Sequence, residues 1–258
     1  GLGSAGNRVL FGSFRSGSFG NQDVPVLHRT TGLGVTEVAP LIKYPDFIFN
    51  MAAMGTNGAN TALVLYGPSG TGPGNAPGTL RWACYNASDD SWADLFVNLG
   101  TPETPNLVTF TGAGVTPVVS NGFVYFCGTS GPSATSLYRW NGLQIGGFNV
   151  VELAFAPPNA GRVQFPLAEV NAKILMPAAG PSGGGRPLVI YDPATPLTAS
   201  FVYPDGLNTA GFPRNPVKVG NKVYFSFMSD PSAVTGGTSV VLWETDGTVA
   251  GTRRAFGV

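Results

Sequence analysis

The sequence has few charged residues, and what it lacks excludes several classes of protein. Fourteen Lys and Arg residues balance fourteen Asp and Glu residues, so 11% of the chain is charged and the net charge is zero; an average soluble domain is about 25% charged. No run reaches the roughly 18 apolar residues of a membrane span. No basic cluster matches the phosphates of nucleic acid. We therefore expect neither a membrane-spanning chain nor a nucleic-acid-binding one.

The residues that are present predict a folded chain rich in turns. Hydrophobic residues make up 43% of the 258 positions, enough for a sizeable core, while 37 Gly and 22 Pro interrupt any long helix. No segment keeps a sustained 3.6-residue apolar period. The chain begins at Gly1 with neither an initiator Met nor a signal segment, so we expect a removed leader or a fragment. The composition favours a secreted or cell-surface protein.

The two cysteines leave two alternatives open. Cys84 and Cys127 are too few for a disulfide scaffold and lack the spacing of metal ligands. They could form one bridge in an oxidising compartment. Otherwise they are two buried thiols that pack as small hydrophobic residues.

A repeat organises the chain. An asparagine precedes each of five apolar segments by one or two positions, and Asn121, Asn171 and Asn221 lie 50 residues apart. The two earlier intervals, from Asn7 to Asn60 and on to Asn121, are 53 and 61 residues. The five segments are Arg8-Val-Leu-Phe11, Ala62-Leu-Val-Leu-Tyr66, Phe123-Val-Tyr-Phe126, Lys173-Ile-Leu-Met176 and Lys222-Val-Tyr-Phe225.

The repeat predicts an all-β protein, a five-bladed β-propeller in one domain over residues 1–258. Each unit of about 50 residues has room for four short strands, and sheets packed on both faces explain strands that are apolar at successive positions. A pair of β-sandwich domains is the rival, but it does not explain the period. We expect an incomplete closing blade. The predicted blades are residues 8–54, 62–119, 123–170, 173–219, and 222–258 with 1–7.

The last unit carries a recognisable motif, Leu242-Trp-Glu-Thr-Asp-Gly-Thr-Val-Ala-Gly-Thr252. This segment resembles the ELWxTDGTxxGT repeat of bacterial secreted proteins with propeller-like arrays. The resemblance implies an exported bacterial protein with a surface, adhesive or assembly role. From the residues themselves, Asp246-Gly247 predicts a tight turn in which Gly takes a positive φ and the Asp side chain binds nearby amides. Trp243 is then expected to pack between blades.

Aromatic residues on the second strand of three units suggest binding sites. An aromatic ring can cover the C–H face of a sugar, and adjacent polar groups can bind its hydroxyls. We therefore predict a non-catalytic extracellular binding module, with glycans or surface ligands held at several sites. Its partners would be glycans or other protein chains at the cell surface, and no cofactor is expected. The candidate residues are Arg81, Trp82, Tyr138, Arg139, Trp140 and Trp243.

Two alternatives remain. A weakly charged, Gly-, Pro- and Thr-rich surface also suits a structural subunit of a larger extracellular assembly. A glycoside hydrolase would need carboxylates at the channel mouth, and the cluster Asp89, Asp90 and Asp94 lies within one loop of one unit. His28, the only histidine, has no Gly-x-Ser-x-Gly partner. Of the three functions considered, the sequence therefore favours an enzyme least.

Overall fold

The computed structural model describes most of the chain, and all structural statements below concern these residues. They are residues 2–5, 8–16, 23–30, 34–37, 47–53, 61–67, 80–86, 91–101, 103–109, 111–129, 135–142, 144–145, 147–157, 162–163, 166–179, 187–196, 198–203, 213–228 and 240–256. This part of the chain is built from β-strands and turns and contains no helix.

The strands form four hydrogen-bonded sheets, and the second of them has ten strands that fall into two antiparallel groups. Each of these two groups is also called a sheet below, and every sheet is named by its strands. The β1–β4 sheet has the order β1 (Leu2–Ala5), β2 (Arg8–Ser16), β3 (Asp23–Thr30) and β4 (Val35–Glu37). The β5–β8 sheet contains β5 (Phe47–Ala53), β6 (Thr61–Gly67), β7 (Leu80–Asn86) and β8 (Ser91–Asn98). β9 (Leu107–Thr109) pairs with β8.

Three further sheets follow in the same manner. The β10–β14 sheet contains β10 (Thr111–Ser120), β11 (Phe123–Thr129), β12 (Ser136–Trp140) and β14 (Phe148–Phe155), with β13 (Gln144–Ile145) beside β14. In the β16–β19 sheet, β15 (Arg162–Val163) and β16 (Ala168–Val170) both pair with β17 (Lys173–Ala179), followed by β18 (Leu188–Tyr191) and β19 (Ala199–Val202). The β20–β23 sheet contains β20 (Pro213–Val219), β21 (Lys222–Met228), β22 (Val240–Thr245) and β23 (Arg253–Arg254).

The sheets are offset by one strand from the repeat units predicted from the sequence. The strand expected to end each unit instead pairs with the strand that opens the next, as β5 does with β6 and β10 with β11. Between β10 and β11 the Asn121-Gly122 turn explains this, because both residues have positive φ, 48° and 79°. A two-residue turn of this kind joins neighbouring antiparallel strands.

The closing sheet is complete, which differs from the expectation of an incomplete blade. Its four strands all come from residues 213–254. The N-terminal strand expected to complete it, β1, pairs with β2 instead. The first and the last sheet are therefore each assembled from strands that are neighbours in the sequence.

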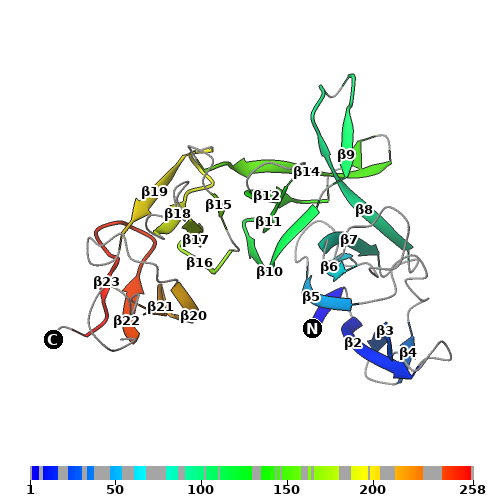
Figure 1. Cartoon of the computed structure of the whole chain (residues 1–258), viewed down its shortest axis with the longest axis horizontal. Helices are drawn as coiled ribbons and strands as arrows, with labels where there is room; N and C mark the ends of the chain where they lie inside the picture. Colours follow the sequence, from blue (N-terminus) through cyan, green and yellow to red (C-terminus); the bar gives the residue numbers. More distant parts are fainter. Residues whose placement is uncertain are drawn as a thin grey trace.

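The first strands of the sheets contact one another in order. β1 contacts β5, β5 contacts β10, β10 contacts β16, and β16 contacts β20. The sheets follow one another along a curved path, with the two chain ends at opposite ends of the curve (Figure 1). Contacts between first strands are what a radial arrangement of sheets produces. The fold is all-β and propeller-like.

Apolar clusters fill the spaces between successive sheets. Val124 and Phe126 point toward the β5–β8 sheet and share a cluster with Leu95. Their neighbours Tyr125 and Cys127 point the other way and pack on the β16–β19 sheet. Both faces of β11 are buried because successive side chains of a strand alternate. This confirms the interpretation of strands that are apolar at successive positions.

Trp243 belongs to the cluster between the last two sheets. Its side chain is 5% exposed and packs among residues of both sheets, including Val170, Ile190 and Phe225. Trp243→Ala should therefore lower the free energy of unfolding by about 3–5 kcal/mol, the usual cost of deleting a buried aromatic side chain. Urea unfolding followed by circular dichroism measures this. Leu153→Ala is the control, since Leu153 is 45% exposed and its loss should cost under about 0.5 kcal/mol.

Candidate functional site

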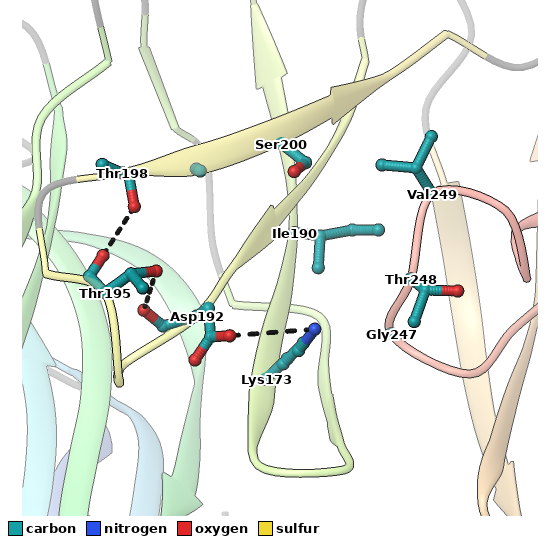
Figure 2. A pocket seen from close by; sticks show the side chains of 10 residues that line it. Lys173, Ile190, Asp192, Thr195, Thr198, Ser200, Gly247, Thr248 and Val249 are labelled. Carbon is teal, nitrogen blue, oxygen red and sulfur yellow. Dashed lines mark hydrogen bonds and ion pairs between the residues drawn. The ribbon is translucent and has the colours of Figure 1, made fainter.

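A polar cleft of about 280 Å³ lies between the β16–β19 sheet and the turn that joins β22 to β23. Figure 2 shows the ion pair of Lys173 and Asp192 on one side and the 247–249 turn on the other. Hydroxyl groups and two branched apolar side chains complete the lining. The residues are Lys173, Ile190, Asp192, Thr195, Thr198, Ala199, Ser200, Gly247, Thr248 and Val249.

Two turns position the charged pair. Asn171 and Ala172, both at positive φ, form the turn that sets Lys173 at the start of β17. Asp192 follows β18 directly, and its Oδ1 accepts a hydrogen bond from the backbone N–H of Ala194 at 2.9 Å. This leaves Oδ2 facing Lys173, 3.7 Å from Nζ. At that distance the two groups attract each other but form no close hydrogen bond.

Three hydroxyls of the lining donate their protons to the protein. Thr195 donates to the carbonyl of Asp192, and Thr198 donates to the carbonyl of Thr195 at 2.7 Å. Thr248 donates to Asp246 Oδ1 at 2.7 Å. A hydroxyl whose proton is already used can only accept a further hydrogen bond. Together with the Asp192 carboxylate, these hydroxyls make the cleft rich in acceptors.

The second wall of the cleft is the turn of the sequence motif. Gly247 has φ 86°, and the backbone N–H of Thr248 donates to Asp246 Oδ1 at 2.9 Å. These contacts confirm the Asp-Gly turn predicted from the sequence. The hydrogen bonds from Thr248 also lower the pKa of Asp246 from its usual value. Thr252 closes the turn through its hydroxyl, 2.7 Å from that of Thr245.

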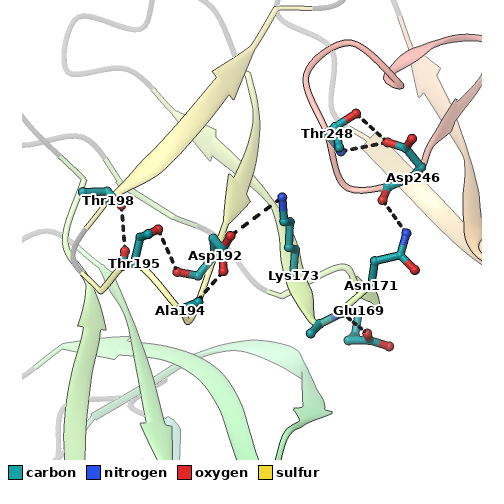
Figure 3. A network of polar contacts seen from close by, with 10 residues as sticks. Glu169, Asn171, Lys173, Asp192, Ala194, Thr195, Thr198, Asp246 and Thr248 are labelled. Atoms are coloured by element: carbon teal, nitrogen blue, oxygen red, sulfur yellow. Dashed lines mark hydrogen bonds and ion pairs between the residues drawn. The ribbon is translucent and has the colours of Figure 1, made fainter.

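A hydrogen bond joins the motif turn to the neighbouring sheet. The side-chain amide of Asn171 donates to the carbonyl of Asp246 at 2.8 Å, as Figure 3 shows. A Cβ added at Gly247 would lie 3.1 Å from the carbonyl oxygen of Val170. A larger residue at position 247 would therefore contact the β16–β17 turn tightly, and the positive φ of Gly247 would strain its backbone. This contact fixes the width of the cleft.

Glu244 of the motif forms ion pairs across three strands. Its carboxylate accepts hydrogen bonds from Lys222 Nζ and Arg253 Nε, both at 2.9 Å. These two bonds lower the pKa of Glu244 from its usual value. Its side chain is only 8% exposed. The motif carboxylate thus holds β21, β22 and β23 together, outside the cleft.

The aromatic residues predicted to bind ligands lie in the interior. Trp140 is 1% exposed and Tyr138 is 5% exposed, and both belong to the cluster between the β5–β8 and β10–β14 sheets. There β8 pairs in parallel with β14 while β7 pairs with β10, so the two sheets enclose these rings. Trp243 lies in another interface, and its Nε1 has no hydrogen-bond partner. None of these three lines the cleft.

The remaining predicted residues are arginines and one tryptophan. Arg139 donates to Glu152 at 2.9 Å and lies 4.5 Å above the ring of Phe123. The side chains of Arg81 and Trp82 lie outside the described side chains. A ligand-binding role for the six residues stays a prediction; of those with described side chains, Tyr138 and Trp140 share one apolar cluster and Trp243 belongs to another.

The two cysteines are free thiols, which agrees with the alternative of two buried packing residues and not with a disulfide. Cys84 and Cys127 are buried thiols in two separate apolar clusters, and no disulfide joins them. Burial raises the pKa of the Cys127 thiol. Its sulfur is therefore a packing group.

The carboxylates considered for catalysis are only partly described. Asp89 and Asp90 lie outside the described residues, and Asp94 lies on β8, far along the chain from the cleft. The described residues contain no group of three or more His, Cys, Asp or Glu side chains placed to hold a metal ion. They also contain no helix long and apolar enough to cross a membrane.

The sequence reasoning missed the cleft residues. Lys173 and Asp192 are 19 positions apart and oppose each other only through the pairing of β17 with β18, in which Ile174 lies opposite Tyr191. Each residue lies just outside that pair, so the strand register would have placed them together. Both had been assigned to strand ends and polar turns without a role.

No known protein family matches the sequence, and no curated protein matches it. Solved structures similar to this chain include a prolyl endopeptidase, with 10% identity, a TM-score of 0.42, and coverage of 96% of this chain and 41% of that protein. An α-L-arabinofuranosidase from Clostridium thermocellum has 13% identity and a TM-score of 0.35, covering 76% of this chain and 68% of that one. The β-propeller domain of the trilobed protease from Pyrococcus furiosus has 8% identity and a TM-score of 0.38, and the match covers 100% of this chain and 94% of that domain.

These structural neighbours correct the predicted function. The sequence indicated a non-catalytic extracellular binding module, with a structural subunit as the alternative, whereas the three proteins named above are hydrolases or part of one. That prediction is therefore wrong as it stands. The chain spans less than half the length of the prolyl endopeptidase. Because these TM-scores are low, neither a reaction nor a residue role of these proteins is assigned to this chain.

The Glu244 ion pairs predict a pH dependence of stability. A carboxylate whose pKa is lowered in the folded state stabilises above its unfolded pKa, and this contribution is lost as the pH falls through the folded pKa. The ordinary pKa of a glutamate carboxyl group is 4.5. Glu244→Gln should therefore lower the urea midpoint at pH 7, and the deficit relative to the unmodified protein should shrink below about pH 4. A deficit that stays constant from pH 7 to pH 3 would contradict this.

Proposed function

We propose that this chain is a five-bladed β-propeller whose cleft binds the amino-terminal end of a short peptide substrate. Four contacts between first strands, from β1 to β5, β10, β16 and β20, join five groups of strands in order, which supports the blade count. The ELWxTDGTxxGT-type repeat and export from the cell are further parts of the proposal. The hydrogen-bonded turn at Asp246-Gly247 and its contact with the preceding sheet support a repeat whose motif joins one blade to another.

The observation that carries the proposal is the charged pair within an acceptor-rich cleft. Lys173 and Asp192 are 3.7 Å apart, with side chains 29% and 38% exposed. A protonated amino terminus is a hydrogen-bond donor with a positive charge, so it suits Asp192 Oδ2 and the oxygens of Thr195 and Thr198. The first carbonyl of the peptide is an acceptor, so it suits Lys173.

The volume of the cleft and its apolar lining suit a short segment of peptide. A cavity of about 280 Å³ is at the lower end of the range for small-molecule sites, room for roughly one or two residues. Ile190 and Val249 face the cleft from opposite walls (Figure 2). They supply apolar surface for the first side chain of the peptide. A ligand at this place contacts both sheets.

Calorimetric titration with tetra-alanine tests the proposal. The peptide with its free amino terminus should bind, whereas N-acetyl tetra-alanine should not, because acetylation removes the charge and two donor protons. Asp192→Asn should weaken binding by about tenfold or more, the usual loss for a hydrogen bond to a charged group. Glu152→Gln is the control, since Glu152 pairs with Arg139 in another sheet and binding should not change.

Equal binding of the free and acetylated peptides, or no binding of either, contradicts the proposal. Mass spectrometry of the same mixtures after incubation measures whether the peptide is cleaved. New fragments that disappear in Asp192→Asn would establish the cleft as part of a peptide-hydrolysing enzyme. Retained binding with an intact peptide would limit its action to holding the substrate.

A further inference from the structure

The apolar part of the cleft lies between Ile190 and Val249. The two side chains face the cleft from the two sheets that form it (Figure 2). Asp192 follows Ile190 by two positions at the end of β18, and side chains two positions apart along a strand project to the same side. A peptide whose ammonium group binds Asp192 therefore places its first side chain beside Ile190.

Ile190 forms a wall of the cleft that cannot move aside. Its side chain is 4% exposed and belongs to the apolar cluster between the last two sheets, together with Phe225 and Trp243. Protein interiors are close-packed, so a buried side chain shifts only if its neighbours shift with it. A ligand must therefore fit against Ile190 as it stands.

The opposite wall, the 247–249 turn, is held at a fixed distance from the β16–β19 sheet. The hydrogen bond from the Asn171 amide to the carbonyl of Asp246 keeps the turn from moving away. The turn cannot move closer, because a Cβ at Gly247 would already lie 3.1 Å from the carbonyl oxygen of Val170 and 3.5 Å from Lys173 Cδ. The separation of the two walls is therefore set before a ligand binds.

Val249 projects from this turn and is the exposed member of the apolar pair. Its side chain is 53% exposed, so it contributes to the cleft more than to the core. A β-branched side chain is also stiff at χ1, so its two methyl groups yield little to a ligand. Replacing Val249 changes the room for a ligand and leaves the packing around Ile190 in place.

We propose that Val249 restricts the cleft to peptides whose first residue has a small side chain, such as alanine. This selectivity rests on the binding of an amino terminus proposed above. A large first side chain overpacks the space between two fixed walls, and overpacking is unfavourable. In an unrestricted cleft a larger apolar side chain would instead bind more tightly, because it buries more apolar surface. The two cases differ in the sign of the effect of size.

Calorimetric titration with two peptides tests the selectivity. One is tetra-alanine and the other has phenylalanine followed by three alanines, both with free amino termini. The unmodified protein should bind tetra-alanine about tenfold or more tightly than the phenylalanine peptide. Val249→Ala should remove or reverse this preference, because the larger side chain gains room. Val217→Ala is the matched control, since Val217 is 58% exposed on β20 and does not line the cleft; the preference should stay.

The possible failures are distinguishable. If the unmodified protein binds the phenylalanine peptide as tightly as tetra-alanine or more tightly, the size limit is overturned, while the proposed binding of an amino terminus stands. A preference for tetra-alanine that persists in Val249→Ala overturns the role of Val249. Binding of neither peptide to the unmodified protein contradicts the proposed function, and this inference with it.

Discussion

Packing on both faces of each sheet is the constraint on which the structure depends. A four-stranded sheet with side chains alternating above and below has two faces to cover, and this chain covers them with its own neighbouring sheets. Tyr125 and Phe126 are adjacent in sequence yet belong to different interfaces. A low charge content is compatible with this plan, because few positions on the inner strands are left to face water.

The positions of the strands could be predicted from the sequence, but their grouping into sheets could not. The segments at Phe123 and Lys222 were predicted as strands and are strands β11 and β21, since local apolar runs between turns determine them. An Asn-Gly pair is typical of a hairpin, but the sequence analysis placed the boundary between two units at Asn121-Gly122, which joins β10 to β11. Lys173 and Asp192 could not be found in the same way, because their meeting depends on the register between β17 and β18.

The motif of the last sheet, residues 242–252, stabilises the contact between two sheets and also forms one wall of the cleft. Glu244, Asp246, Thr248 and Thr252 each form hydrogen bonds within their own sheet, and Asn171 binds the motif backbone from the neighbouring sheet. The aromatic residue of the motif, Trp243, packs beneath them. One turn therefore holds two sheets at a fixed separation, and the space left above that contact is the cleft.

The assembly of every sheet from consecutive strands has a consequence for the genetics of this protein. No strand is exchanged between the two ends of the chain in the described residues, where the ladders between two sheets are those of β7 with β10 and of β8 with β14. Each unit of about 50 residues supplies the strands of one sheet, so duplication of one unit adds a whole sheet.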